Sequence, residues 1–271
     1  GGLLIAVDSS DEVQYSAGIS ESDVKYTLFN YRHAKEIIQS TLWRTAFSEI
    51  ENAVLGSPLF VYANKSAKNA RLDVVQQVQN TYFDRRLAVD YGWDYHPPAT
   101  GISESQLTAD FRKVFRGEDQ ELALQVEVQF GNMSRWYSDI FKFQAAYSAD
   151  LIQMGVSIVP MAGLAGRIDS NIVSFERCRR ELPAAKLSIT HPILLVGIEP
   201  DHATITYNLR NSRFGAINEI SGRGKTENRY RIVNAFINGV AETEVGPDSL
   251  VGHVPARAAE LEAEEIGDDE A

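Results

Sequence analysis

The stretch from residue 109 to residue 132, ADFRKVFRGEDQELALQVEVQFGN, constrains the fold of this chain more than any other. It predicts a β-hairpin, because a polar, glycine-containing turn at 117–120 separates two runs of mixed apolar and polar residues. If the two arms pair symmetrically about this turn, Asp110 lies opposite Glu127. The other face of the hairpin is then apolar except for one lysine, which suits a face that packs on a core.

The alternation of side chains favours this register over its neighbours. Phe111 falls opposite Val126, and a slip of one residue would turn the acidic residues toward the core. The polar face carries Asp110 and Glu127, with Gln129 next along the strand. Their Cβ atoms would lie about 5 Å apart, a spacing that suits shared ligation of a hard cation such as Mg²⁺. The alternative is an ordinary amphipathic hairpin with a solvated polar face.

Composition places the chain among ordinary globular proteins. It has 271 residues, of which 44% are apolar, 23% charged and 10% aromatic, and it is long enough to bury a substantial core. No apolar run approaches the roughly 18 residues of a membrane span, so no membrane partner is expected. The single cysteine, Cys178, excludes an internal disulfide and is typical of a cytoplasmic protein. We expect it to pack in the core.

The net charge of −11 is unevenly spread and does not exclude DNA as a partner. Residues 257–271 contain seven acidic residues and one arginine, a net of −6, which leaves −5 for the rest. Basic clusters remain around Lys65 and Lys68 and between Arg223 and Arg231. Because DNA binding depends on the local electrostatic field, a DNA-binding face is compatible with a negative net charge.

Periodicity predicts strands that alternate with helices, which favours one α/β domain. We expect a domain at 30–256, an N-terminal extension at 1–29 and a flexible acidic tail at 257–271. Helices are predicted at 33–55, 72–92, 136–151 and 174–182, and strands at 59–63, 156–161, 189–200 and 202–209. Residues 218–233 are expected to form a basic loop with a flanking strand.

Common catalytic motifs are missing from the sequence, apart from the acidic hairpin. There is no Walker A loop, no GxGxxG after a strand, no HExxH and no GxSxG. Two acids and a polar residue on adjacent strands indicate a metal-dependent phosphodiester nuclease. Asp110 and Glu127 would hold Mg²⁺ with the carbonyl of Val128, and Gln129 would orient water, since an amide cannot act as a base.

The order of segments around the hairpin adds a family resemblance. VEVQFGN, an aromatic helix, VSIVPM and then PILLVGIEP closely resemble the BglII/BstYI type II restriction endonucleases, whose motif has the form D…ExQ. Glu127 and Gln129 match its second half, and Gly92-Trp93 matches a pair upstream of the metal-binding aspartate. The resemblance covers about residues 30–200 and implies a PD-(D/E)XK nuclease core, a central mixed β-sheet flanked by helices.

One position departs from the family pattern. Its members have a shorter hairpin, and their spacing would point to Glu118, beside Asp119, as the first metal ligand. We prefer Asp110, because symmetric pairing places it opposite Glu127 and because its distance from Trp93 is similar to that in the family.

The resemblance implies a Mg²⁺-dependent type II restriction endonuclease that cuts double-stranded DNA and leaves 5′-phosphate ends. Its site would be a six-base palindrome with a GATC core, and a palindrome calls for a homodimer. Two alternatives stay open: a repair or structure-specific nuclease of the same fold, and a DNA-binding protein that does not cleave.

Two kinds of contact with DNA are expected. Asparagine side chains are suited to reading adenine, and lysine side chains contact phosphate and so position the duplex. The candidates are Asn132, Ser134, Arg167, Ser170, Asn171, Lys65 and Lys68. For Asn132 and Asn171, the alternative is that they cap or turn the chain.

Overall fold

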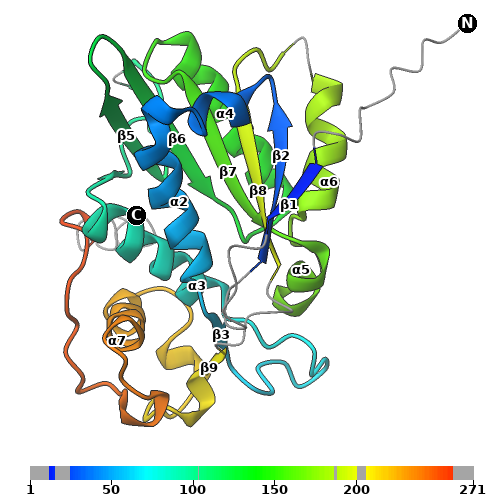
Figure 1. Cartoon of the computed structure of the whole chain (residues 1–271). Helices are drawn as coiled ribbons and strands as arrows, with labels where there is room; N and C mark the ends of the chain where they lie inside the picture. Colours follow the sequence, from blue (N-terminus) through cyan, green and yellow to red (C-terminus); the bar gives the residue numbers. More distant parts are fainter. Residues whose placement is uncertain (1–11, 16–24, 103, 186–187, 200–205, 259–271) are drawn as a thin grey trace, which may run out of the picture.

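The computed structural model describes residues 12–15, 25–102, 104–185, 188–199 and 206–258, and its centre is a seven-stranded sheet (Figure 1). The strands follow the order β1-β2-β8-β7-β6-β5-β4. The pairs β6–β7 and β7–β8 are parallel and the other pairs are antiparallel, so the predicted mixed sheet is confirmed. Its strands are β1 (Glu12–Tyr15), β2 (Lys25–Tyr31), β4 (Asp94–Tyr95), β5 (Phe111–Arg116), β6 (Glu121–Val128), β7 (Met154–Pro160) and β8 (Ile193–Glu199).

The predicted hairpin register is confirmed. Strands β5 and β6 pair antiparallel with Phe111 opposite Val126. The turn between them is closed by a hydrogen bond of 2.8 Å from the Gly117 N–H to the Gln120 carbonyl. Both Phe111 and Val126 are buried, as expected for the face that packs on the core.

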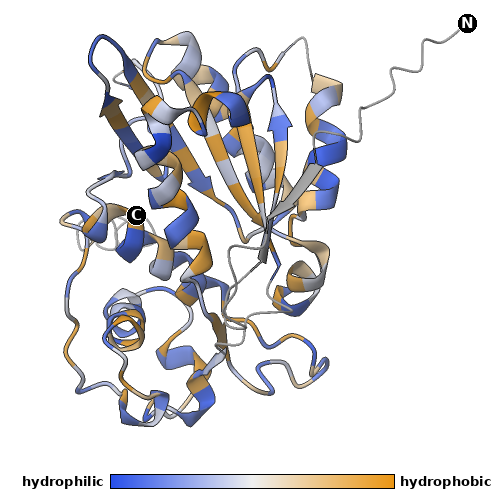
Figure 2. Ribbon diagram, viewed as in Figure 1, coloured by the Kyte–Doolittle hydropathy of each residue, from blue (hydrophilic) through white to orange (hydrophobic). Residues whose placement is uncertain are grey.

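Helices cover both faces of the sheet and create two hydrophobic cores (Figure 1). The helices are α1 (Ala34–Ile38), α2 (Arg44–Leu55), α3 (Gln76–Phe83), α4 (Met133–Ser148), α5 (Ala162–Ile168), α6 (Phe175–Glu181) and α7 (Thr226–Ile237). Helices α2 and α3 bury their apolar residues in the larger core, and α4 and α6 bury theirs in the smaller one. Figure 2 shows hydrophobic residues along β7 and β8, the strands that are enclosed by both cores.

Helix α4 crosses from β6 to β7 and carries the predicted apolar stripe. Trp136, Ile140 and Phe143 are buried at spacings of three to four residues, which places them on one side of the helix. The helix begins at Asn132, whose side chain accepts a hydrogen bond from the Arg135 N–H. Asp139 and Lys142 flank this stripe and contact the polar residues of β6 and the segment just after it, an arrangement that shapes the site.

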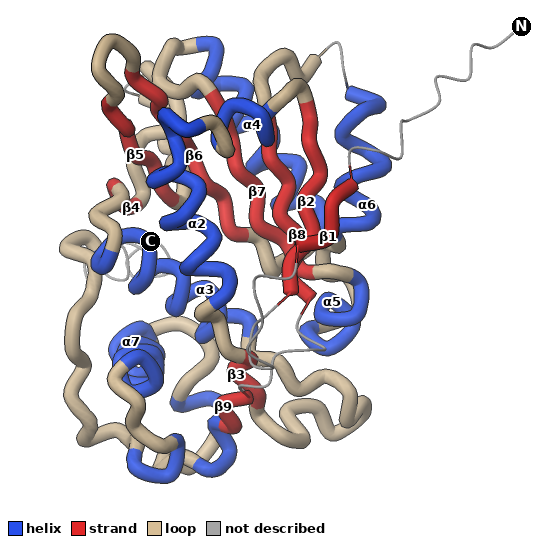
Figure 3. The backbone as a smooth tube through the Cα atoms, in the orientation of Figure 1, coloured by secondary structure: helices blue, strands red, loops and turns tan. Residues whose placement is uncertain are grey.

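The C-terminal part of the described chain corrects one prediction. Residues 218–233 were expected to contain a strand, but residues 226–237 form helix α7, which packs against α3. Its β-branched residues Ile232 and Val233 favour a strand locally, but burial in the larger core favours the helix. Strand β9 (Thr206–Asn208) pairs parallel with β3 (Leu59–Val61) in a separate two-stranded sheet, visible in Figure 3.

The N-terminal boundary also differs from the expectation. Residues 25–29, assigned to an extension, belong to β2, which pairs along its whole length with β8. The sequence KYTLFNY is rich in aromatic residues, and consecutive residues 26–29 are buried, so the strand lacks a simple alternation. Residues 259–271 of the predicted acidic tail lie outside the described residues.

Two smaller expectations can be compared with the structure. Cys178 is buried in the smaller core, as predicted, and burial raises the pKa of its thiol. In the described part of the chain, no helix is both long and apolar enough to cross a membrane.

Close packing at Gly155 generates a prediction about stability. A Cβ atom at this position of β7 would lie 2.8 Å from Cδ1 of Phe143, so Gly155 lets α4 approach the sheet. Gly155→Ala should therefore lower the free energy of unfolding by about 1–3 kcal/mol, measured by urea denaturation. Gly166→Ala, within α5 where a Cβ meets no atom within 4 Å, is the matched control and should be neutral or slightly stabilising. Equal stability of both variants would contradict the assigned packing.

Candidate active site

A polar cleft of about 300 Å³ lies where the hairpin, helix α4 and the segment before β4 meet. It contains the predicted acid Asp110 and the predicted amide Gln129. Its lining residues are Asn80, Asp84, His96, Asp110, Val128, Gln129, Arg135, Ser138, Asp139 and Lys142. The hairpin and the helix that follows it therefore supply most of the cleft.

Asp110 and Glu127 come together as the register requires. Asp110 directly precedes β5, and its Oδ2 accepts a hydrogen bond of 2.8 Å from the Val128 N–H. Glu127, the next residue back along β6, is fully buried, and its Oε1 accepts a hydrogen bond of 2.7 Å from Gln125. Glu127 and Gln125 are thus buried beneath α4, whereas Asp110 and Gln129 stay partly exposed at the cleft.

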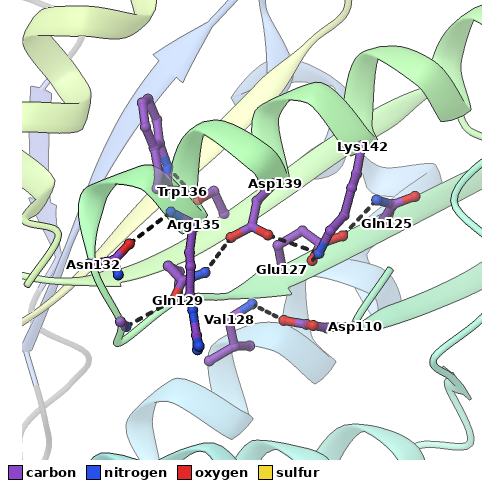
Figure 4. Close-up of polar contacts among 12 residues, drawn as sticks. Asp110, Gln125, Glu127, Val128, Gln129, Asn132, Arg135, Trp136, Asp139 and Lys142 are labelled. Atoms are coloured by element: carbon purple, nitrogen blue, oxygen red, sulfur yellow. Dashed lines mark hydrogen bonds and ion pairs between the residues drawn. The ribbon is translucent and has the colours of Figure 1, made fainter. Parts of the chain in front are cut away.

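Helix α4 contributes two charged side chains that the sequence analysis did not single out (Figure 4). The Nζ of Lys142 lies 3.0 Å from Oε2 of Glu127 and 2.9 Å from Oδ1 of Asp139. Asp139 also accepts a hydrogen bond of 2.7 Å from Nε2 of Gln129, whose Oε1 accepts one of 2.8 Å from the Gly131 N–H. A continuous polar network therefore joins the strand motif to the helix.

A signal for these two residues was present in the sequence. Arg135, Ser138, Asp139 and Lys142 recur at intervals of three, one and three residues, so they share one side of the helix. This side lies directly beside the apolar stripe. A polar strand face followed at once by a helix with a polar side would have indicated that the two face each other.

Burial raises the pKa values of the three acids in the network, and mutual repulsion adds to the effect for Glu127 and Asp139. Burial raises the pKa of Asp110, and the nearby charge of Lys142 only partly offsets this effect. Burial and repulsion from Asp110 and Asp139 raise the pKa of Glu127 well above its usual range. For Asp139, burial and repulsion from Asp110 raise the pKa to about 6.

Lys142 is the cation that stabilises this network. Burial alone would lower the pKa of Lys142, but attraction to Glu127, Asp139 and Asp110 outweighs it, so the pKa lies above its ordinary value. Lys142 is therefore charged at neutral pH. With all groups ionised, three carboxylates and one ammonium leave a local charge of −2.

The donor set fits a hard divalent cation. Burial raises the pKa values of Asp110 and Glu127, which disfavours their charged forms, and a bound cation would stabilise those forms. Among the described residues, no group of three or more His, Cys, Asp or Glu side chains has the arrangement of a metal site. Mg²⁺ commonly binds proteins through one or two carboxylates and retains water, so two acids meet its requirement.

Asp84 is the third acid that lines the cleft, beside Asp110 and Asp139. It opens a π-helical segment, Asp84–Asp90, directly after α3. Burial, with a smaller contribution from repulsion by Asp110, raises its pKa to about 8. Such π-helical segments are rare and frequently lie at functional sites. Asp84 is remote from the hairpin in sequence, so no local pattern pointed to it.

The residues predicted to read bases lie close to one another. Asn132 and Ile172 form an isolated antiparallel bridge, and the Val173 N–H donates a hydrogen bond of 2.9 Å to the Gly131 carbonyl. Ser170 and Asn171 are exposed immediately before this bridge. Oδ1 of Asn132 accepts bonds from the Arg135 N–H and the Ser134 hydroxyl, so Asn132 does cap α4 as the alternative proposed.

The predicted basic residues differ in their surroundings. Nζ of Lys65 donates to the carbonyls of Val74, at 2.6 Å, and Ile168, at 3.1 Å. Arg167 forms a two-pronged ion pair with Asp73. These two cations tie down the loop before Ser170, whereas the Lys68 side chain is exposed.

The rival first ligand lies elsewhere. Glu118 and Asp119 are exposed in the hairpin turn, at the far end of β5 from Asp110. Neither lines the cleft. The geometry therefore favours Asp110 as the partner of Glu127.

A family model described as restriction endonuclease BglII/BglIII matches residues 26–198, more than half of the 271 residues. Among solved structures, the chain is similar to restriction endonuclease BglII in complex with a DNA 16-mer, with a TM-score of 0.50 and 22% identity. That match covers 64% of this chain and 77% of the other. It confirms the restriction-endonuclease-like fold that the resemblance implied.

The crystal structure of free BglII is similar with a TM-score of 0.43 and 19% identity, covering 64% of this chain and 78% of the other. No curated protein matches the chain by sequence.

The pKa of Asp84 generates a prediction about pH. Because its pKa rises from 3.8 to about 8, the folded state holds this proton more tightly than the unfolded state does. The free energy of unfolding should therefore fall as the pH rises through this window, by up to about 1.4 kcal/mol per pH unit for one proton. Asp84→Asn should make this fall shallower in urea denaturation series with EDTA.

A charge control accompanies this experiment. Asp119→Asn removes one acid from the exposed hairpin turn and should leave the pH dependence of stability as in the unmodified protein. If the free energy of unfolding depends on pH in the same way in Asp84→Asn and in the unmodified protein, Asp84 does not hold a proton in the folded state.

Proposed function

Because this chain belongs to the BglII/BglIII family of restriction endonucleases, we propose that it cuts double-stranded DNA at a specific site, hydrolysing phosphodiester bonds with Mg²⁺. One observation carries the catalytic assignment: Asp110 and Glu127 come together beside Gln129, next to an open polar cleft. The family match contributes the reaction, and the hairpin contributes the residues.

The two acids and the Val128 carbonyl are the proposed ligands of Mg²⁺. When bound there, Mg²⁺ would polarise the scissile phosphate and lower the pKa of an attacking water. The hydrogen bond from the Val128 N–H holds the Asp110 carboxylate against the end of β6. Gln125 and Lys142 hold the two oxygens of Glu127. The protein thus fixes both carboxylates before any ligand arrives, which reduces reorganisation during the reaction.

Gln129 has a positioning role in this proposal. Its amide is held between Gly131 and Asp139, and it lines the cleft next to Asp110. An amide neither titrates in the relevant range nor carries positive charge. Gln129 therefore orients water and Asp139 by hydrogen bonding, and it does not remove a proton.

The proposed DNA contacts belong to the exposed surface near the start of α4. Asn132, Ser134, Ser170 and Asn171 would face the bases and sugars, and the amides of Asn132 and Asn171 are suited to adenine. Lys68 would contact phosphate, which positions the duplex without reading it. Lys65 and Arg167 act mainly by holding the loop, with any phosphate contact secondary to that.

We also propose an oligomeric state and a type of recognition sequence. A palindrome of six base pairs with a GATC core would be read by a homodimer, in which each subunit cuts one strand and leaves a 5′-phosphate. The single cysteine fits the reducing cytoplasm as the working compartment.

Incubation with plasmid DNA and Mg²⁺ tests the reaction. Discrete fragments support a restriction endonuclease, and sequencing their ends gives the site and the stagger. Nicking of branched DNA alone would indicate a repair enzyme, and a gel shift without any cleavage would indicate a binding protein.

Substitutions test the catalytic assignment. Asp110→Asn and Glu127→Gln keep the side-chain shapes but remove the charges that would hold Mg²⁺. Because such a cation contributes several kcal/mol of charge stabilisation, each variant should cut plasmid about a thousandfold more slowly or worse. Glu118→Gln, in the exposed turn, should cut as fast as the unmodified protein. The reverse result, with Glu118→Gln inactive and Asp110→Asn active, would refute the assignment.

Base reading by Asn171 makes a separate prediction. If its amide contacts a base, Asn171→Ala should weaken discrimination against sites with one altered base pair by about 1–3 kcal/mol. Cleavage rates on matched and singly altered duplexes measure this difference. Lys68→Ala is the contrasting variant, because loss of a phosphate contact should weaken binding to all sequences alike. Unchanged discrimination in Asn171→Ala removes it from the reading residues.

A further inference from the structure

Hydrolysis of a phosphodiester places negative charge on the non-bridging oxygens of the phosphate as the transition state forms. The cleft that would receive this phosphate is lined by the acids Asp84, Asp110 and Asp139, with Glu127 beneath them. A phosphate in such surroundings needs cationic donors that are already in place. The cleft offers two, Arg135 and Lys142, both on the polar side of α4.

Gln129 cannot supply this charge. Both ends of its amide are engaged, Oε1 with the Gly131 N–H and Nε2 with Asp139. One amide hydrogen remains, but it is a neutral donor, and charge-assisted hydrogen bonds are roughly twice as strong as neutral ones. The strand motif therefore lacks a cation of its own.

Lys142 provides a cation directly beside the strand motif. Its Nζ lies 3.0 Å from Glu127 and 2.9 Å from Asp139, and Figure 4 shows the side chain descending from α4 onto the strand. An ammonium group has three N–H donors, and these contacts occupy two. The side chain retains 15% exposure and lines the cleft, which leaves room for a third acceptor from the cleft side.

The two carboxylates hold this ammonium in a fixed place. A flexible lysine would lose side-chain entropy on contacting a ligand, but here that loss has already occurred in folding. Arg135 is different, because it is exposed and lies seven residues earlier on the same helix, about 10 Å along its axis. Arg135 thus suits a neighbouring phosphate, whereas Lys142 lies directly at the acid pair.

We propose that Lys142 is a catalytic residue that donates its third N–H to a non-bridging oxygen of the scissile phosphate. This inference rests on the proposed nuclease function. Lys142 stays protonated throughout. The water oxygen bonds to phosphorus and loses its proton to solvent water, the P–O3′ bond breaks with its electron pair going to O3′, and O3′ takes up a proton from solvent. The lysine stabilises the charge that builds up on the phosphate between these events. Helix α4 would therefore supply the positive charge that the strand motif does not carry.

Single-turnover cleavage of a short duplex that contains the protein's own site tests the proposal. Lys142→Met should cut about 100-fold more slowly or worse, as when one donor to a developing oxyanion is removed. Lys142→Arg should stay within about tenfold, because the charge is kept. Lys113→Met is the matched control: it removes a partly buried lysine that pairs with Glu49 at 2.9 Å on the other face of the hairpin. It should cut at the unmodified rate.

Phosphorothioate duplexes separate phosphate contact from a purely structural role. Sulfur at the oxygen that Lys142 contacts should slow the unmodified protein by about tenfold for one of the two diastereomers, because sulfur is a weaker acceptor. The same substitution should cause no comparable extra slowing in Lys142→Met, since the contact is already lost. Should Lys142→Met fail to fold, Lys142→Gln, which retains donors for the carboxylates without charge, takes its place with the same expectations.

Several results would overturn the proposal. Cleavage by Lys142→Met within about threefold of the unmodified rate would do so. Equal sulfur effects in both proteins for both diastereomers would show that Lys142 acts only by supporting Glu127. If the unmodified protein cuts no DNA while Lys113→Met and the unmodified protein are both folded, the proposed function itself fails, and this inference fails with it.

Discussion

The antiparallel register of β5 and β6 determines which side chains of the hairpin meet the core and which meet helix α4. With Phe111 opposite Val126, the apolar residues of both strands pack into the larger core, and Glu127 faces the opposite way. A shift of one residue would exchange these two faces, so that buried charge would face the apolar core. The position of the acid pair, and of every residue that contacts it, depends on this pairing.

A charged layer beneath a helix is costly unless its members satisfy one another. Removing one partner of a buried ion pair leaves an uncompensated charge, and this loss is strongly destabilising. Here Glu127, Asp139 and Lys142 form a chain of contacts that also includes Gln125 and Gln129. The raised pKa values of Glu127 and Asp139 mean that their charged forms are disfavoured in the folded protein, and a bound cation would stabilise those forms. Such an arrangement favours binding of a cation over maximal stability.

The sequence was informative where local rules decide the structure. The period of two along the hairpin was sufficient to place Asp110 near Glu127, and the apolar spacing of α4 identified its buried side. It was insufficient for Asp139, Lys142 and Asp84, because their roles depend on which polar surfaces meet in three dimensions. Helix α7 was missed, and strand β2 was assigned to an N-terminal extension, for a related reason. Both are stabilised by tertiary burial, and their local patterns resemble a strand and an extension respectively.

The bridge between Asn132 and Ile172 has a mechanical consequence. The hydrogen bond from Val173 to the Gly131 carbonyl fastens the loop that contains Ser170 and Asn171 to the segment just after β6. Gly131 also donates its N–H to Gln129. A Cβ at Gly131 would lie 2.6 Å from the Gln129 Oε1, so these two groups are closely packed. The loop cannot shift without stretching these bonds or carrying Gly131 with it. The surface proposed to sense sequence and the groups proposed to act on phosphate are therefore joined by a short, stiff linkage.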